Sequence, residues 1–243
     1  MSETNENEKL TKTIELFGGY TDRKGVLHKT VTFSRRPTML DLFNIDSNPQ
    51  SQIPTQYHDL LIRTMISKFG DLTMPVLVNV LLALDQYDRE DLNEAADAFL
   101  RETRDDRTAE FIDDETVKLA FGVTIDGAHY DIVKFGNVLT GKDAAEADDY
   151  GAGVRRACFE IGREIVELRS SEVDLTRAGG LAIDQFNTMD AEDYAVLQTA
   201  AVRWRASFRL KRKALQRERD GVGRVPVVAG AENAGSGNSA NAG

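Results

Sequence analysis

The sequence contains few of the residues that form reactive or cross-linked sites. Its 243 residues include one cysteine, Cys158, and three histidines, His28, His58 and His129. A single cysteine cannot form a disulfide within the chain, which is typical of proteins of a reducing cytoplasm. We interpret Cys158 as a small core residue of an amphipathic helix, because the sequence around it supplies no base for a catalytic thiol.

The histidines and acidic residues also lack the spacing that metal ligands require. No two histidines are three or four residues apart, so one helix cannot present two of them to an ion. The acidic segments 85–90 and 184–193 lack the glycine that a calcium loop requires. Helix capping by Asp88, with Asp91 beside it, and by Asp190 is the simpler interpretation. We therefore predict no metal and no cofactor.

Phosphate-binding glycine loops and nucleophile motifs are also missing. The two glycine pairs, Gly18-Gly19 and Gly179-Gly180, match neither phosphate-binding pattern. We expect the first pair in a bulge or twist of a hairpin and the second at a close helix contact. No Gly-x-Ser-x-Gly elbow occurs. The sequence predicts no catalytic residues, and we expect the protein not to be an enzyme.

Long apolar runs are lacking too. No stretch approaches the roughly 18 apolar residues of a membrane helix, and residues 1–8 are too polar and acidic for a secretory signal. The net charge is −10, yet residues 203–219 carry eight Lys or Arg against one Glu. The remaining chain is strongly acidic and should repel nucleic acid and membrane phosphate. We expect a soluble protein that binds no membrane.

What the sequence does contain is an internal repeat at a spacing of about 100 residues. In each half an apolar run, a turn with glycine and a second apolar run predict a β-hairpin. The matched segments are 13–16, 22–25 and 27–33 in the first half, and 116–119, 126–127 and 130–135 in the second. His28 and His129 take near-equivalent places after the turns, and duplication explains this better than a metal ion shared between them.

Amphipathic helices are predicted after each hairpin. The segments 62–84 and 157–183 each indicate one or two helices, with Pro75 opening the second helix of the first half. The further matched positions are 84–87 with 183–186, Asp91-Leu92 with Asp193-Tyr194, and the final helices, which end near Arg101 and Arg219.

These elements predict an α+β fold of two similar modules, each a β-hairpin followed by amphipathic helices. A long basic C-terminal helix and a disordered tail complete the chain. The predicted boundaries are a disordered N-terminus at 1–10, the first module at 11–102, a linker at 103–114, the second module with its basic terminal helix at 115–220, and a disordered tail at 221–243. A single α+β domain with coincidental internal similarity is the alternative.

The basic helix supplies the candidate partner-binding residues Trp204, Phe208, Arg209, Arg212 and Leu215. Apart from Arg209, they recur at spacings of three or four residues and form one apolar stripe with cations beside it. The stripe can dock on the second module while the cations face water. It can also bind an acidic protein or another copy of the chain, and nucleic acid is the least favoured occupant.

Specific residues carry a resemblance to a known family. They are Ile14-Glu15-Leu16, Gly25, Val31-Thr32-Phe33, Arg36-Pro37-Thr38, Asp41, Leu84-Asp85 through Asp91-Leu92, and Phe99-Leu100, followed by Val117-Lys118-Leu119, Gly127, Val133-Lys134-Phe135, Asp143 and 184–194. Their order resembles the Mu-like tail assembly chaperones of contractile-tailed phages. Members of that family usually carry one such module, so the tandem copy and the basic extension are departures.

The resemblance implies a protein that shields the tape-measure protein, without catalysis, while the tail tube is built around it. It implies a place in the host cell cytoplasm and absence from the finished virion. Amphipathic grooves for a helical partner and a charged surface would suit that role. A structural component of a phage tail or baseplate is the alternative, and nucleic-acid binding through Arg203–Arg219 is a weaker one. The chain could also form a homo-oligomer.

Overall fold

A computed structural model of the chain describes residues 10–222, with side chains for residues 10–219. The chain divides into two compact units, Met1–Arg205 and Ala206–Gly243. The disorder predicted for residues 1–9 and 223–243 lies outside the described residues. The last helix extends to Val222, just inside the range predicted as a disordered tail.

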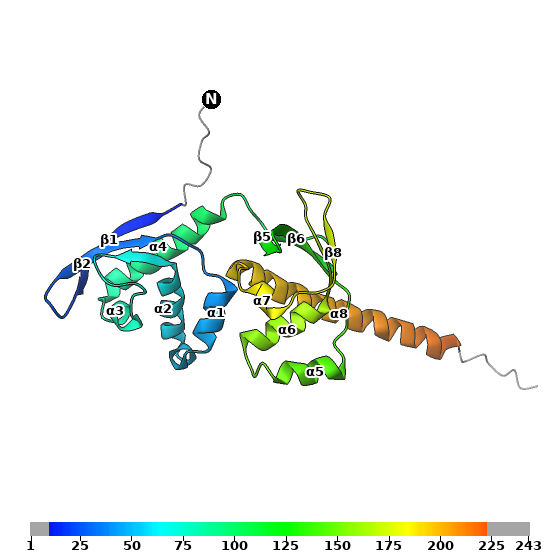
Figure 1. Ribbon diagram of the computed structural model, residues 1–243. Coiled ribbons are helices and arrows are strands. Elements are labelled where there is room, and N and C mark those ends of the chain that lie inside the picture. The colour runs from blue at the N-terminus through cyan, green and yellow to red at the C-terminus, as the bar shows by residue number, and fades with distance from the viewer. Residues whose placement is uncertain (1–9, 223–243) are drawn as a thin grey trace, which may run out of the picture. The chain divides into compact units, whose positions relative to one another are not determined.

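The first module combines a three-stranded antiparallel sheet with helices (Figure 1). Its elements are β1 (Lys12–Thr21), β2 (Leu27–Phe33), α1 (Met39–Asp46), the 3-10 helix η1 (Pro49–Gln52), α2 (Pro54–Met65), β3 (Ile66–Phe69), α3 (Val78–Leu82) and α4 (Gln86–Arg104). The helix α4 packs on β1, and the core between them includes Leu16, Phe33 and Phe99.

The second module repeats this order with a five-stranded sheet, β4-β5-β6-β7-β8. Its elements are β4 (Glu110–Phe111), β5 (Thr116–Ile125), β6 (Ala128–Phe135), α5 (Gly141–Asp148), α6 (Val154–Glu164), β7 (Ile165–Arg169), β8 (Thr176–Ala178), α7 (Ile183–Phe186) and α8 (Ala191–Val222). Here β5, β6 and β7 correspond to β1, β2 and β3. The predicted α+β class, with two similar hairpin-and-helix modules and a long basic C-terminal helix, is confirmed.

Both hairpins carry the same irregularity. The β1–β2 register shifts between Glu15 and Tyr20, and the β5–β6 register shifts between Lys118 and Val123. The bulge predicted at the first glycine pair is therefore confirmed, and the second hairpin repeats it around Gly122.

Glycine is required at one position of each bulge. Gly19 and Gly122 have φ of 73° and 70°, in the left-handed region that side chains avoid. A Cβ on either residue would lie 2.5 Å from a main-chain oxygen of the neighbouring strand, that of His28 or of Tyr130. The two bulges thus have the same backbone conformation.

A buried aspartate binds the amides of each bulge. The Asp88 carboxylate accepts hydrogen bonds from the amides of Phe17, Gly18 and Gly19 at 2.7, 3.1 and 2.6 Å. Both Asp88 and Asp193 are fully buried. Asp193 accepts the equivalent three bonds, from Ala120, Phe121 and Gly122, at 2.8, 2.9 and 2.8 Å.

The helices that carry these aspartates bury residues at the same positions relative to the aspartate. In α4 the residues buried after Asp88 are Leu92, Ala95, Ala96 and Phe99, and in α8 those at the same distances from Asp193 are Leu197, Ala200, Ala201 and Trp204. The paired small alanines allow the helix to lie close to the sheet, and the leucine and the aromatic ring fill the core on either side.

The structure changes the predicted correspondence between the modules. The helix α4 is capped by Asp85, which accepts a bond from the Asp88 amide, so the predicted capping by Asp88 is wrong. Asp190 does cap α8, because it accepts a bond from the Glu192 amide. The counterpart of Asp85 is therefore Asp190, three residues before Asp193, rather than Asp184 as predicted. The pairing of Asp91 with Asp193 is wrong for the same reason.

The predicted helices in 62–84 and 157–183 are only partly correct: α2 and α3 cover residues 62–65 and 78–82, and α6 covers residues 157–164. Each segment also contains a strand, β3 or β7, antiparallel to the second strand of its hairpin. In β3 the buried residues are Ile66 and Phe69, three positions apart, because the register shifts beside Ile66. That spacing is also the spacing of an amphipathic helix, so the sequence pattern was ambiguous.

The segment 103–114, predicted as a linker, is partly structured. The helix α4 continues to Arg104, and β4 pairs with β5 through Phe111 and Val117. The Arg203 guanidinium lies 3.8 Å from the centroid of the Phe111 ring. A strand of two residues among many charges is too short to give a recognisable pattern.

The loops after β2 and β6 end in the same motif. Thr38 before α1 and Thr140 before α5 each form a capping box with an aspartate three residues later, Asp41 or Asp143. The hydrogen bonds from Thr140 lower the pKa of Asp143 below its ordinary value. This motif aligns residues 36–40 with residues 138–142.

We predict that Asp88→Ala lowers the free energy of unfolding by roughly 2–4 kcal/mol, because three buried amides lose their acceptor. Urea denaturation followed by circular dichroism measures the change. Asp97→Ala, an exposed aspartate of the same helix, is the matched control and should change stability by less than about 0.5 kcal/mol. Equal effects of the two substitutions would contradict the role of Asp88.

Candidate functional site

Cys158, the residue most suited to covalent chemistry, lies in the core of the protein. Cys158 on α6 is fully buried, and this burial raises its pKa to about 12. At neutral pH its thiol is therefore protonated, which is the poorly nucleophilic form. This placement agrees with the interpretation of Cys158 as a core residue.

The three histidines do not lie together at one site. His28 is buried, and its Nδ1 accepts a hydrogen bond from the Asp71 amide at 3.3 Å. His129 and His58 are exposed. The structural counterpart of His28 is Tyr130, next to His129, so the two histidines take near-equivalent places, as predicted, that differ by one position. Within residues 10–219, no group of three or more His, Cys, Asp or Glu side chains could hold a metal ion.

The buried carboxylates have partners in the fold. Burial raises the pKa of Glu164, whose Oε1 accepts a bond from Arg205 Nε at 2.7 Å. Burial also raises the pKa of Asp193, although three backbone amides oppose the shift. Asp131 accepts hydrogen bonds from the amide and hydroxyl of Ser171. These carboxylates hold strands and helices together.

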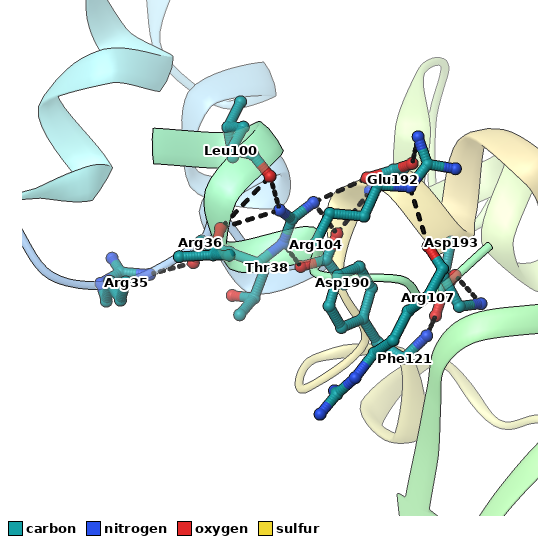
Figure 2. Close-up of polar contacts among 12 residues, drawn as sticks. Arg35, Arg36, Thr38, Leu100, Arg104, Arg107, Phe121, Asp190, Glu192 and Asp193 are labelled. Atoms are coloured by element: carbon teal, nitrogen blue, oxygen red, sulfur yellow. Dashed lines mark hydrogen bonds and ion pairs between the residues drawn. The ribbon is translucent and has the colours of Figure 1, made fainter. Parts of the chain in front are cut away.

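A polar cluster joins the two modules within the first compact unit. Arg36, on the loop after β2, reaches the start of α8 and the end of α4 (Figure 2). Its Nε is 2.7 Å from Asp190 Oδ2, and its Nη2 is 2.7 Å from Glu192 Oε2. Its Nη1 donates to the Leu100 carbonyl at 2.6 Å. The Arg36 and Asp190 side chains are only 12% and 10% exposed, so both charges are largely withdrawn from water.

An aromatic ring and further cations complete this cluster. The Arg36 guanidinium lies 4.4 Å from the centroid of the Phe121 ring, and the Arg107 guanidinium lies 5.6 Å from it. Arg104 pairs with Glu192 at 3.1 Å. Stacking on an aromatic face suits a guanidinium better than an ammonium, which favours arginine over lysine at position 36.

Main-chain hydrogen bonds continue the contact beyond Arg36. The Ala191 amide donates to the Pro37 carbonyl at 3.1 Å, and the Met39 amide donates to the Met189 carbonyl at 2.9 Å. Thr38 and Asp190 form an antiparallel bridge. We call residues 36–40 the docking segment. We call the second-module residues that receive it the docking surface: Phe121, Asn187, Met189, Asp190, Ala191 and Glu192.

The basic end of α8 is the other candidate surface. Of the predicted partner-binding residues, Trp204 is buried, and its Nε1 donates to the Asn137 carbonyl at 3.3 Å. Phe208 is half-buried, whereas Arg209, Arg212 and Leu215 are exposed. The Trp204 ring thus belongs to the core of the first unit, and the exposed part of the predicted stripe lies in the second unit.

Sequence reasoning missed the docking surface. From the sequence, Arg36, Pro37 and Thr38 are part of a family resemblance, and Asp190 is a helix cap within the matched range 184–194. The detectable signal was the repeated spacing Asp-x3-Leu-x2-Ala-Ala-x2-aromatic at Asp88 and Asp193. That spacing would have given the correct correspondence between the modules.

No family model, curated protein or solved structure matches this chain. Among the described helices, none has the length and apolarity needed to cross a membrane.

We predict that Arg36→Met lowers the free energy of unfolding by roughly 2–4 kcal/mol, because Asp190 and Glu192 lose their shared cation while Asp190 stays largely buried. Thermal and urea unfolding measure the loss. The control is Arg35→Met, which removes a more exposed pair with Asp41 and should cost no more than about 1 kcal/mol. A loss at Arg36 no larger than at Arg35 would show that the cluster does not hold the modules together.

Proposed function

We propose that this chain is a phage tail assembly chaperone-like protein that binds a helical tail protein, the tape measure, without catalysis. Two tandem hairpin-and-helix modules support the proposal, since the same order of elements underlies the resemblance to the Mu-like chaperones. The supporting observation with most weight is the exposed surface of α8 in the second unit. Leu210 and Leu215 are 68% and 61% exposed there, among closely spaced cations.

That surface suits an acidic amphipathic helix. Phe208, Arg212 and Leu215 follow one another at spacings of four and three residues, so they lie along one side of α8. Leucine contacts would bury apolar area, and the cations would pair with carboxylates flanking the apolar stripe of the partner. A tape-measure protein is long and helical, and its apolar side chains need cover before the tube closes around it.

The charge distribution supports the same role. The chain carries a net charge of −10 although residues 203–219 are basic. An acidic body keeps a complex with an apolar partner in solution, because like-charged complexes repel one another. The basic segment marks the place where an acidic partner is attracted.

Co-expression with the tape-measure protein encoded in the same genome tests the proposal. We expect the two proteins to purify together. The triple substitution Arg209→Glu, Arg212→Glu and Leu215→Asp should weaken retention at least tenfold, because it reverses charge and removes apolar area on the proposed surface. Quantitative pull-down measures the retained fraction.

The matched control is Arg23→Glu, Lys24→Glu and Leu27→Asp, which makes the same kinds of change at exposed residues of the first hairpin. It should leave retention unchanged. Failure of the folded proteins to form any complex would refute the proposed function. Presence of the chain in purified virions, detected by mass spectrometry, would favour a structural tail component instead.

A further inference from the structure

The docking surface of the second module has a counterpart in the first module. The buried aspartates fix the correspondence, because Asp88 and Asp193 bind equivalent bulges and each follows a capping aspartate by three residues. The first-module residues at the matching positions are Gly18, Leu82, Leu84, Asp85, Gln86 and Tyr87. We call them the counterpart surface.

One of the two surfaces is covered and the other is open. Within the second module, Asp190, Ala191 and Glu192 are half-buried beneath the docking segment. At the matching first-module positions, Asp85, Gln86 and Tyr87 are all exposed, and Tyr87 is 76% exposed. Figure 2 shows the covered surface, with Arg36 and Thr38 lying against Asp190 and Glu192.

The docking segment also has a counterpart. The capping boxes at Thr38 and Thr140 align residues 36–40 with residues 138–142. In the docking segment Pro37 and Met39 are buried. In the counterpart segment Val138 is 48% exposed, and Thr140 and Gly141 are exposed as well. The chain therefore contains an exposed segment, residues 138–142, and an exposed counterpart surface. These two correspond in position to the docking segment and the docking surface, which are already in contact.

The docked pair and the open pair differ in chemistry on both sides of the contact, in the segment and in the surface. The docked pair sets a cation, Arg36, against the carboxylate of Glu192. At the corresponding positions the open pair has Val138 and Tyr87, so the cation is replaced by an aliphatic side chain and the carboxylate of Glu192 by an aromatic ring, while Asp85 keeps the carboxylate of Asp190. An ionic contact inside the chain thus corresponds to two apolar side chains that are both exposed.

We propose that a second copy of this chain occupies the counterpart surface, with its residues 138–142 docked against Asp85 and Tyr87 as residues 36–40 dock against Asp190 and Glu192. Such a contact joins two different surfaces, so it links copies head to tail. The apolar Val138–Tyr87 contact provides the burial, and main-chain hydrogen bonds like those of Pro37 and Met39 provide the register. This inference does not rest on the proposed function.

Sedimentation velocity of the full chain, over concentrations up to about 100 µM, tests the inference. The wild-type chain should associate reversibly. Tyr87→Glu and Val138→Glu should each weaken association at least tenfold. Glutamate is the residue that the second module carries at the position of Tyr87, so this substitution suits the start of a helix. Circular dichroism verifies that each variant folds.

Mixing the two variants separates head-to-tail docking from other contacts. The Tyr87→Glu chain keeps its segment 138–142, and the Val138→Glu chain keeps its counterpart surface, so an equimolar mixture should form dimers that grow no further. Val173→Glu is the control, because Val173 is 59% exposed and lies outside both surfaces; it should associate like the wild type.

Four results would overturn the inference. One is a wild-type chain that stays monomeric throughout the concentration range. Another is association that persists unchanged in both variants. The third is loss of association in each variant without recovery in the mixture, since a symmetric interface would give that result. Binding of a different protein through Tyr87 by a monomeric chain would assign the surface to that protein and likewise overturn the proposal.

Discussion

The buried carboxylate at the start of the last helix of each module is the interaction on which the fold depends. A bulge in a hairpin turns three successive amides away from the strand ladder, and buried amides require an acceptor. Asp88 and Asp193 supply it, each from the first turn of a helix, where a negative charge is also favoured by the helix dipole. One contact therefore sets the bulge conformation, the need for glycine, and the point where the helix crosses the sheet.

The repeated unit gives the chain two surfaces at equivalent positions beside the two buried aspartates. The second module's surface is filled by the chain itself, through Arg36 and the residues after it. The first module's surface carries exposed Tyr87 in place of Glu192 and is open. The two modules thus differ in chemistry at these positions, although each has the bulge, the buried aspartate and the capping aspartate. In both the internal docking and the proposed association of copies, a segment that follows a hairpin would dock at the start of a module's last helix. The side chains at the two contacts would differ.

The sequence was sufficient for the hairpins and the module order, because alternating apolar residues around glycine turns have few other structural solutions. It was insufficient for β3 and β7, whose buried residues are three positions apart where the strand register shifts and so resemble those of a helix. The role of Asp88 was misassigned because an aspartate near a helix start usually caps that helix, and Asp85 competes for this position. The contact of Arg36 with Asp190 joins residues 154 positions apart, and no local pattern reports such a contact. Burial of Trp204 likewise depends on what the helix packs against.

Hydrogen exchange measured by NMR on the amides of Gly19 and Gly122 tests the central role of the buried carboxylates most directly. If each amide is bound by an aspartate in the core, both should exchange as slowly as the amides of the paired strand positions beside them. Exchange of either glycine amide at the rate of an unstructured peptide, in a chain whose neighbouring strands remain protected, would contradict the account.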